Sequence, residues 1–207
     1  MRFARSIFGP RQLSVAAHRA AVILGAVAAL GAAAILGGCA TDDVDGGAQF
    51  EASSGTTRAA LDVPEGEAAS IGSYALSIVT PEAGADGAES AEIITGEREG
   101  TVTGLWTDDV TGDQAVDVIV AMSSAGSGSY GTCHVYAASG SGFTRVELAP
   151  LSEGQRDGFM GHDSFEVVDG VLFRTFPVYA SGDPNARPTG GVLGYRYDFE
   201  NGAWVEP

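Results

Sequence analysis

Beyond residue 70, the apolar residues come in short stretches rich in β-branched and aromatic side chains, separated by clusters of Gly, Pro and Asp. The stretches at 74–80, 91–95, 102–106 and 116–122 are short, and none repeats with the 3.6-residue period of a helix. Short strands divided by frequent turn signals are typical of antiparallel β-proteins. We therefore predict an all-β fold, an antiparallel two-sheet β-sandwich or flattened barrel of about eight short strands.

The clearest turn signals lie near the C-terminus. Two alternating stretches within 164–179 flank Asp169-Gly170, a pair that favours a two-residue hairpin turn. Apolar residues alternate again over 193–199, and Asn201-Gly202 indicates another hairpin. No stretch after the N-terminal 38 residues has a helical period, and only residues 151–160 have room for a single helical turn. The sequence therefore predicts almost no helix in the β-domain.

Residues 132–139 form an alternating strand, with Cys133, Val135 and Ala137 on one face and Thr132, His134 and Tyr136 on the other. The apolar neighbours predict that Cys133 is a buried, unreactive thiol. We interpret His134 and His162 as polar surface or loop residues. Because no G-x-S-x-G motif accompanies them, the sequence does not favour an enzyme.

The N-terminus has the features of an export signal. Its first 38 residues contain four arginines and no acid, and residues 20–38 are uncharged and largely apolar. An uncleaved transmembrane anchor is the alternative, since the apolar run is close to spanning length. The run ends in Leu36-Gly37-Gly38-Cys39, which resembles the bacterial lipobox and implies that Cys39 is lipidated and begins the mature protein. Ala40 then implies sorting to the outer membrane, so we expect a lipid-anchored periplasmic protein.

These features divide the chain into three parts. Residues 1–38 are a lipoprotein signal peptide, and residues 39–69 are the lipidated cysteine and a flexible acidic tether with few large apolar residues. Residues 59–63 are the one part of the tether that could pair as an edge strand. Residues 70–207 form the β-domain. With Cys39 lipidated, Cys133 has no disulfide partner.

The net charge of the chain limits the kind of partner that it can bind. The chain carries −16 overall, and without residues 1–38 seven arginines remain against 27 acids, a net charge of −20. Such a surface repels phosphates, which excludes nucleic acid as a partner. It attracts a cationic protein, although acidity also serves solubility alone.

Three aspartates, Asp109, Asp113 and Asp117, are the one candidate metal site. Their spacing is similar to that of a calcium loop, but Thr111 and Gln114 stand where a ligand and the turn glycine are needed. We therefore interpret these residues as a turn leading into the next strand, and we expect no metal or other cofactor. The alternative is an envelope β-sandwich module that binds calcium or glycan.

Two loops are longer than a hairpin needs. Residues 123–128 are all Ser, Ala or Gly, and the next large side chain is Tyr130, a residue type favoured in binding sites. A flexible hairpin connection explains the small residues equally well. Residues 180–191 form a Pro- and Gly-rich loop in which Arg187 is the candidate for a second contact, the alternative being an ordinary connection.

Four segments together resemble one protein family: SGSYG at 127–131, CHVYAASGSGFTRVEL at 133–148, the block from Gly158 to Gly191, and YRYDFENGAWV at 195–205. They are similar to bacterial periplasmic inhibitors of lysozyme, in particular to the inhibitors of i-type (invertebrate) lysozymes, over residues 71–205. The resemblance implies an antiparallel β-sandwich and a lysozyme partner. It also implies that Ser127, Gly128, Ser129 and Tyr130 enter the lysozyme active-site cleft. Whether two copies pair as a homodimer stays open.

Overall fold

The computed structural model describes residues 47–82, 87–140 and 142–207, which belong to one compact unit. Within these ranges the chain forms twelve strands and one 3-10 turn, η1 (Gly154–Arg156). The predicted signal peptide 1–38 and Cys39 lie outside the described residues. In the part that is described, no helix is long and apolar enough to cross a membrane.

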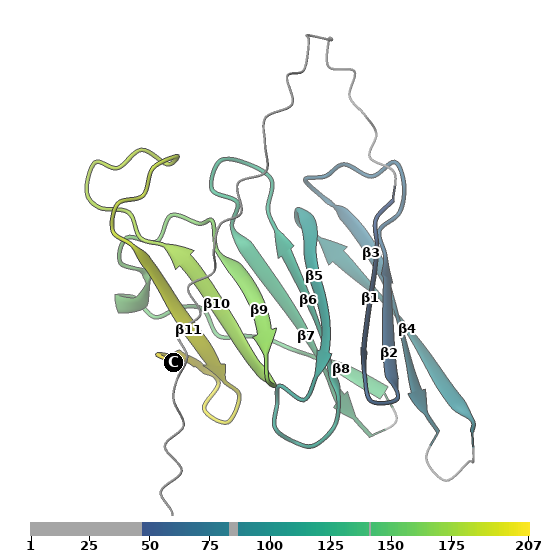
Figure 1. Ribbon diagram of the computed structural model, residues 1–207. Coiled ribbons are helices and arrows are strands. Elements are labelled where there is room, and N and C mark those ends of the chain that lie inside the picture. Colours follow the sequence, from purple (N-terminus) through teal and green to yellow (C-terminus); the bar gives the residue numbers. More distant parts are fainter. Residues whose placement is uncertain (1–46, 83–86, 141) are drawn as a thin grey trace, which may run out of the picture. The chain divides into compact units, whose positions relative to one another are not determined.

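The strands form three antiparallel sheets of four, and strands consecutive in sequence are neighbours in each sheet (Figure 1). The first sheet consists of β1 (Gln49–Ser54), β2 (Thr57–Asp62), β3 (Gly72–Pro81) and β4 (Glu89–Arg98). The second consists of β5 (Thr101–Asp108), β6 (Asp117–Ser123), β7 (Gly131–Ser139) and β8 (Gly142–Val146). The third consists of β9 (Ser164–Val168), β10 (Val171–Pro177), β11 (Val192–Asp198) and β12 (Ala203–Val205).

The predicted all-β antiparallel architecture is confirmed, and the layout differs in detail. The described residues form twelve strands instead of the expected number of about eight, and three open sheets instead of two sheets or a closed barrel. Asp169-Gly170 is the predicted two-residue hairpin turn between β9 and β10. Both of its residues have positive φ, 51° and 73°, as the favoured turn type requires.

The prediction that residues 39–69 form a tether is wrong for residues 49–62. These residues are β1 and β2, which pair with each other and then with β3. Thr57, Ala59 and Leu61 alternate into the core, whereas the residues between them are exposed or partly exposed. Phe50 and Leu61 are the two large inward side chains of this hairpin, and Ala52 and Ala59 beside them are small. The alternation is therefore weak in the sequence, and β3 and β5 supply neighbouring core residues.

The second sheet lies between the other two. β6 is buried along its whole length except for Ser123, because its faces contribute to two different cores. Val118, Val120 and Met122 pack toward the first sheet, and Ile119 packs toward the third. The continuous apolar run of β6 is typical of a strand that is covered on both faces.

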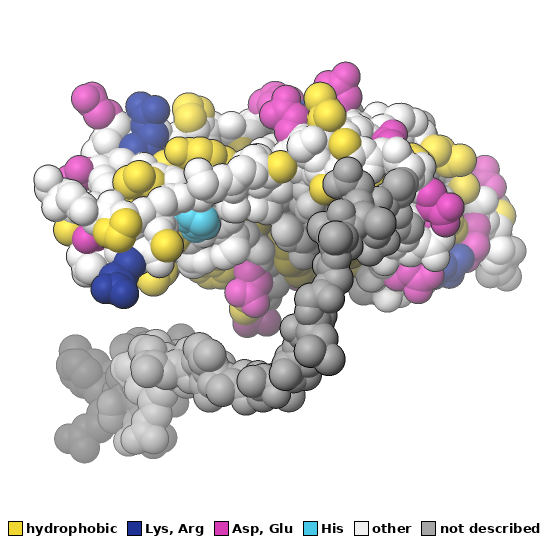
Figure 2. All heavy atoms as spheres, turned by 90° about the horizontal axis from the view of Figure 1, so that it is seen from above, with side chains coloured by type: hydrophobic (Ala, Val, Ile, Leu, Met, Phe, Trp, Pro, Cys, Tyr) yellow, Lys and Arg dark blue, Asp and Glu magenta, His cyan; other side chains and the backbone are white. Residues whose placement is uncertain are grey.

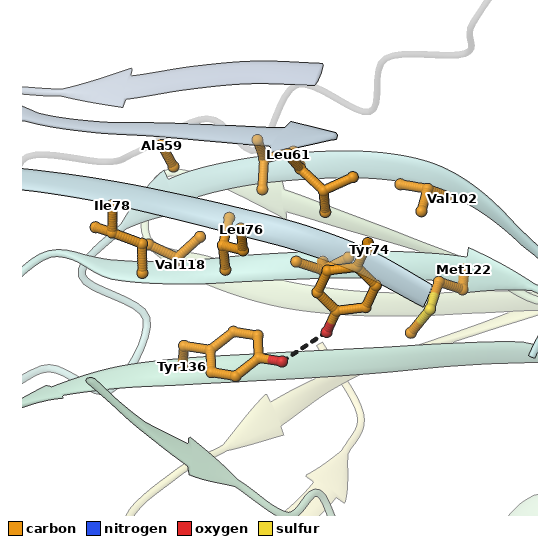
Figure 3. Packing of buried hydrophobic residues seen from close by; sticks show 11 residues of the cluster. Ala59, Leu61, Tyr74, Leu76, Ile78, Val102, Val118, Met122 and Tyr136 are labelled. Carbon is orange, nitrogen blue, oxygen red and sulfur yellow. Dashed lines mark hydrogen bonds between the residues drawn. The ribbon is translucent and has the colours of Figure 1, made fainter. Parts of the chain in front are cut away.

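The first core contains a buried polar side chain, His134, which we expected at the surface. His134 is only 5% exposed, so its interpretation as a polar surface or loop residue is incorrect. Its Nδ1 lies 2.7 Å from the hydroxyl of Tyr74, which in turn lies 2.6 Å from the hydroxyl of Tyr136. Figure 3 shows the two tyrosines meeting between the sheets, among the aliphatic side chains of β2, β3 and β6. Because the first sheet covers this face of β7, both faces of the strand are buried.

Three connections gather at one end of the domain (Figure 1). They are residues 124–130 between β6 and β7, residues 157–163 leading into β9, and residues 178–191 between β10 and β11. Antiparallel pairing of consecutive strands places alternate connections at the same end of a sheet. This loop end contains all the residues that the sequence singled out for partner binding.

Candidate functional site at the loop end

The 124–130 loop is closed by its own hydrogen bonds. At its base, the N–H of Ser124 donates to the carbonyl of Tyr130, and the N–H of Tyr130 donates to Oγ of Ser124, both at 2.8 Å. Within the loop, Gly126 has a φ of 115°, a conformation that favours glycine, and its carbonyl accepts the N–H of Ser129 at 3.3 Å. The run of small residues is therefore a folded loop rather than a slack connection.

The loop exposes the side chains that the sequence selected. Ser127 is exposed, Gly128 and Ser129 are partly buried, and Tyr130 is 51% exposed. The ring of Tyr130 lies edge-on to that of Phe159, with centroids 5.7 Å apart and an interplanar angle of 78°. Tyr130 thus keeps an exposed face while one edge is fixed by a neighbouring aromatic ring.

A supporting segment, residues 158–163, lies directly against the loop. The N–H of His162 donates to the carbonyl of Gly128 at 2.6 Å, and a Cβ at Gly161 would collide with the same carbonyl. Asp163 accepts the N–H of Gly131, the residue that follows Tyr130, at 2.6 Å. The sequence analysis gave this segment no role. The feature of the sequence that indicates a fixed turn here is the pair of glycines at 158 and 161, both of which have positive φ.

The 178–191 loop meets the 124–130 loop. Asn185 donates from its side-chain nitrogen to the carbonyl of Ser127, and the hydroxyl of Tyr179 donates to the carbonyl of Asn185 at 3.0 Å. Arg187 is exposed on this loop, and its N–H donates to the carbonyl of Pro184 at 2.9 Å. The two predicted binding loops are therefore adjacent. Asn185 was not among the predicted residues, because its contact joins positions that are distant in sequence.

Asp183 orders the 178–191 loop from within. Its Oδ2 accepts the N–H of Ala180 at 2.8 Å and that of Thr189 at 2.7 Å. Desolvation acts to raise the pKa of Asp183, but these hydrogen bonds favour the ionised form, and the net pKa lies below its ordinary value. The carboxylate thus fixes the loop by bonding backbone groups.

Viewed from the loop end (Figure 2), the surface carries scattered hydrophobic side chains among polar groups and backbone. Figure 2 shows hydrophobic side chains near a histidine, whereas the acidic side chains lie mainly around the rim of the view. Besides Tyr130, the exposed apolar residues of the three connections and their strand ends include Met160, 41% exposed, and Val192, 72% exposed. A rigid, partly apolar surface of this kind is suited to binding a folded partner.

The three aspartates of the candidate metal site bond backbone N–H groups in the turn between β5 and β6. Asp117 is fully buried and accepts from Val110, Thr111 and Ala138. Asp109 accepts three N–H groups of the same turn, from residues 112–114. Desolvation raises the pKa of Asp117 despite these bonds. Among the described residues, no three acidic, histidine or cysteine side chains are grouped so as to hold a metal ion.

Cys133 is a free thiol on the face of β7 that packs against the second core. By surface area it is partly rather than fully buried. Desolvation raises the pKa of this thiol to about 12, with a small opposing effect of Arg174. The thiol therefore stays protonated near neutral pH, in agreement with its interpretation as an unreactive residue.

The fold and the loop end define a β-sandwich protein that presents a rigid exposed loop carrying one tyrosine. A family model described as periplasmic lysozyme inhibitor of I-type lysozyme (PliI) matches residues 51–157, more than half of the chain. The chain belongs to this family, and the family resemblance seen in the sequence is confirmed. The match starts earlier than the expected 71–205, within β1, and it ends before the supporting segment and the third sheet.

One solved structure is similar to this chain. It is the crystal structure of PliI-Ah, a periplasmic lysozyme inhibitor of I-type lysozyme from Aeromonas hydrophyla. The two are 22% identical with a TM-score of 0.38, and the similarity covers 49% of this chain and 85% of that chain. A comparison with curated proteins found no match.

Proposed function

We propose that this protein inhibits lysozyme, with i-type lysozyme as its target, and so protects bacterial peptidoglycan. Ser127, Gly128, Ser129 and Tyr130 enter the active-site cleft, and Arg187 makes a second contact. The observation that carries this proposal is the 124–130 loop. It lies inside the family match, it is held by hydrogen bonds at its base and on one side, and it leaves Ser127 and Tyr130 exposed.

The chemistry of the loop is suited to a glycosidase cleft. Such enzymes carry two carboxyl groups, one protonated as the general acid and one ionised. The hydroxyl of Ser127 both donates and accepts, so it can pair with either form. Tyr130 offers a ring that packs in a sugar subsite and a hydroxyl that forms a hydrogen bond there. The internal bonds of the loop reduce the entropy that is lost on binding.

The electrostatics of the loop end favour the same partner. Two of its carboxylates are already bonded: Asp163 pairs with Arg174, and Asp183 binds backbone groups. Arg187 is exposed beside the loop, where it can approach the acidic residues of a cleft. The rest of the acidic domain attracts a cationic lysozyme from a distance.

We propose that the protein acts in the periplasm, held to the outer membrane by lipid on Cys39. The description of its family as periplasmic supports the compartment. The lipobox-like sequence before Cys39 supports the anchor. In this role the protein is a binding partner and not an enzyme.

A turbidity assay tests the proposal. The protein is added to i-, c- and g-type lysozymes acting on a suspension of bacterial cell walls, and the rate of clearing is followed. We expect inhibition of the i-type enzyme at the lowest protein concentration. If none of the three enzymes is inhibited, the proposal is wrong.

A further inference from the structure

The guanidinium of Arg174, on β10, lies within a cage of aromatic rings next to the 124–130 loop. Its central carbon is 5.3 Å from the ring centroid of Phe159, 5.4 Å from that of Phe165 and 5.8 Å from that of Trp204. The side chain of Arg174 is 13% exposed. A planar, weakly hydrated guanidinium stacks on aromatic faces in a way that a lysine ammonium does not.

The same guanidinium holds Asp163, whose side chain is completely buried. Nε and Nη2 of Arg174 donate to Oδ2 of Asp163 at 2.8 Å and 2.6 Å. The other carboxylate oxygen, Oδ1, accepts the N–H of Gly131 at 2.6 Å. Arg174 is thereby linked through one carboxylate to the residue that follows Tyr130.

A second path from Arg174 reaches the ring of Tyr130 itself. Phe159 lies between the two, with Arg174 over its ring and Tyr130 at 5.7 Å in an edge-on arrangement. Phe159 also packs on Phe176 in the second core, with centroids 4.8 Å apart. The backbone next to Tyr130 and its ring are thus both fixed by groups that contact Arg174.

A buried ion pair is costly to desolvate, and its replacement by apolar residues is often neutral for stability. Because this ion pair lies at the base of the exposed 124–130 loop, it is placed to fix the conformation of that loop. We propose that Arg174, with Asp163 and Phe159, is a positioning group that holds Tyr130 in its binding conformation before the lysozyme arrives. This inference rests on the proposed function. The three residues lie outside the family match at 51–157, so membership of the family does not imply it.

The expected effect follows from the cost of ordering a side chain on binding. Ordering one free side chain at an interface weakens binding by roughly threefold to tenfold. Arg174→Lys keeps the charge near Asp163 but loses the planar, two-nitrogen contact and the stacking. Its inhibition constant toward an i-type lysozyme should rise by this factor.

A double-mutant cycle tests whether Arg174 acts through Tyr130. Inhibition constants are measured for the parent, Arg174→Lys, Tyr130→Ala and the double variant against one purified i-type lysozyme. Arg98→Lys is the matched control, since Arg98 is a buried arginine paired with Glu67 and bonds no residue of the three loop-end connections. We expect Arg174→Lys to weaken inhibition in the parent but to have little further effect beside Tyr130→Ala, while Arg98→Lys leaves the inhibition constant unchanged.

The outcomes separate the two proposals. If Tyr130→Ala inhibits as well as the parent, the proposed function of the loop fails, and the positioning role fails with it. If Tyr130→Ala loses inhibition but Arg174→Lys weakens it equally in both backgrounds, or no more than Arg98→Lys does, only the positioning role is wrong. Should Arg174→Lys not fold, Phe159→Leu replaces it in the cycle, because it removes the ring between Arg174 and Tyr130 and keeps an apolar side chain.

Discussion

The buried imidazole of His134 should make the domain lose stability in mild acid. His134 is 5% exposed, and burial, with a smaller contribution from the charge of Arg145, lowers its pKa from 6.5 to about 4. Its Nδ1 lies 2.7 Å from the hydroxyl of Tyr74. Burial and the hydrogen bond with Tyr136 raise the pKa of Tyr74, so this hydroxyl stays protonated and is able to donate to a neutral imidazole. The neutral imidazole is therefore the form that fits the folded state.

The sign and size of the effect follow from proton linkage. Between pH 6.5 and pH 4, the unfolded chain binds a proton at His134 that the folded chain does not, so stability falls as the pH falls through this window. One pKa unit corresponds to about 1.4 kcal/mol, so the full shift corresponds to a loss of about 3 kcal/mol at pH 4 relative to pH 7. This contribution is fully present above pH 6.5.

The assay is urea denaturation of the parent and of His134→Gln at pH 7, 5.5 and 4. Glutamine can still accept from the hydroxyl of Tyr74 but does not titrate, and the acidic groups titrate in both proteins. The free energy of unfolding should therefore fall between pH 7 and pH 4 by about 3 kcal/mol more in the parent than in the variant. Equal losses in the two proteins, or an imidazole that titrates near its ordinary pKa in the folded protein, would refute the reasoning.

The other predictions concern the loop, the charge, the aspartates and the cysteines. Ser127→Ala and Tyr130→Ala should each weaken inhibition by about tenfold or more and change the free energy of unfolding by less than about 0.5 kcal/mol. Arg187→Ala should weaken inhibition less. Unchanged inhibition by the Ser127 and Tyr130 variants would show that the loop is only a connection. Raising the salt concentration should slow association with a basic lysozyme far more than it speeds dissociation, and a salt-independent association rate would contradict steering. EDTA and Ca²⁺ should leave the melting temperature unchanged, since the three aspartates between β5 and β6 already bond backbone groups. Mass spectrometry should find lipid on Cys39 and a reduced thiol at Cys133, and a disulfide between them would contradict both assignments.

Local patterns in the sequence determined several strands beyond residue 70 and the turn between β9 and β10. Alternation in β7 and β11, the continuous apolar run of β6 and the Asp169-Gly170 pair each depend on neighbours a few residues apart, so they can be recognised without a structure. The same holds for the candidate loop. Tyr130 stood out because a large aromatic side chain followed a run of small residues.

Only the tertiary structure decided which faces are covered and which loops meet. The alternation of β7 placed His134 opposite Cys133, but it could not show that the first sheet buries the His134 face as well. β1 and β2 contain few large apolar residues and so resembled a tether, and pairing with β3 made them part of the fold. The hydrogen bonds that the 124–130 loop receives from outside come from His162 and Asn185, more than thirty residues away along the chain. Such contacts depend on how sheets stack and where their connections converge, and these are properties of the whole chain that the local order of polar and apolar residues does not contain.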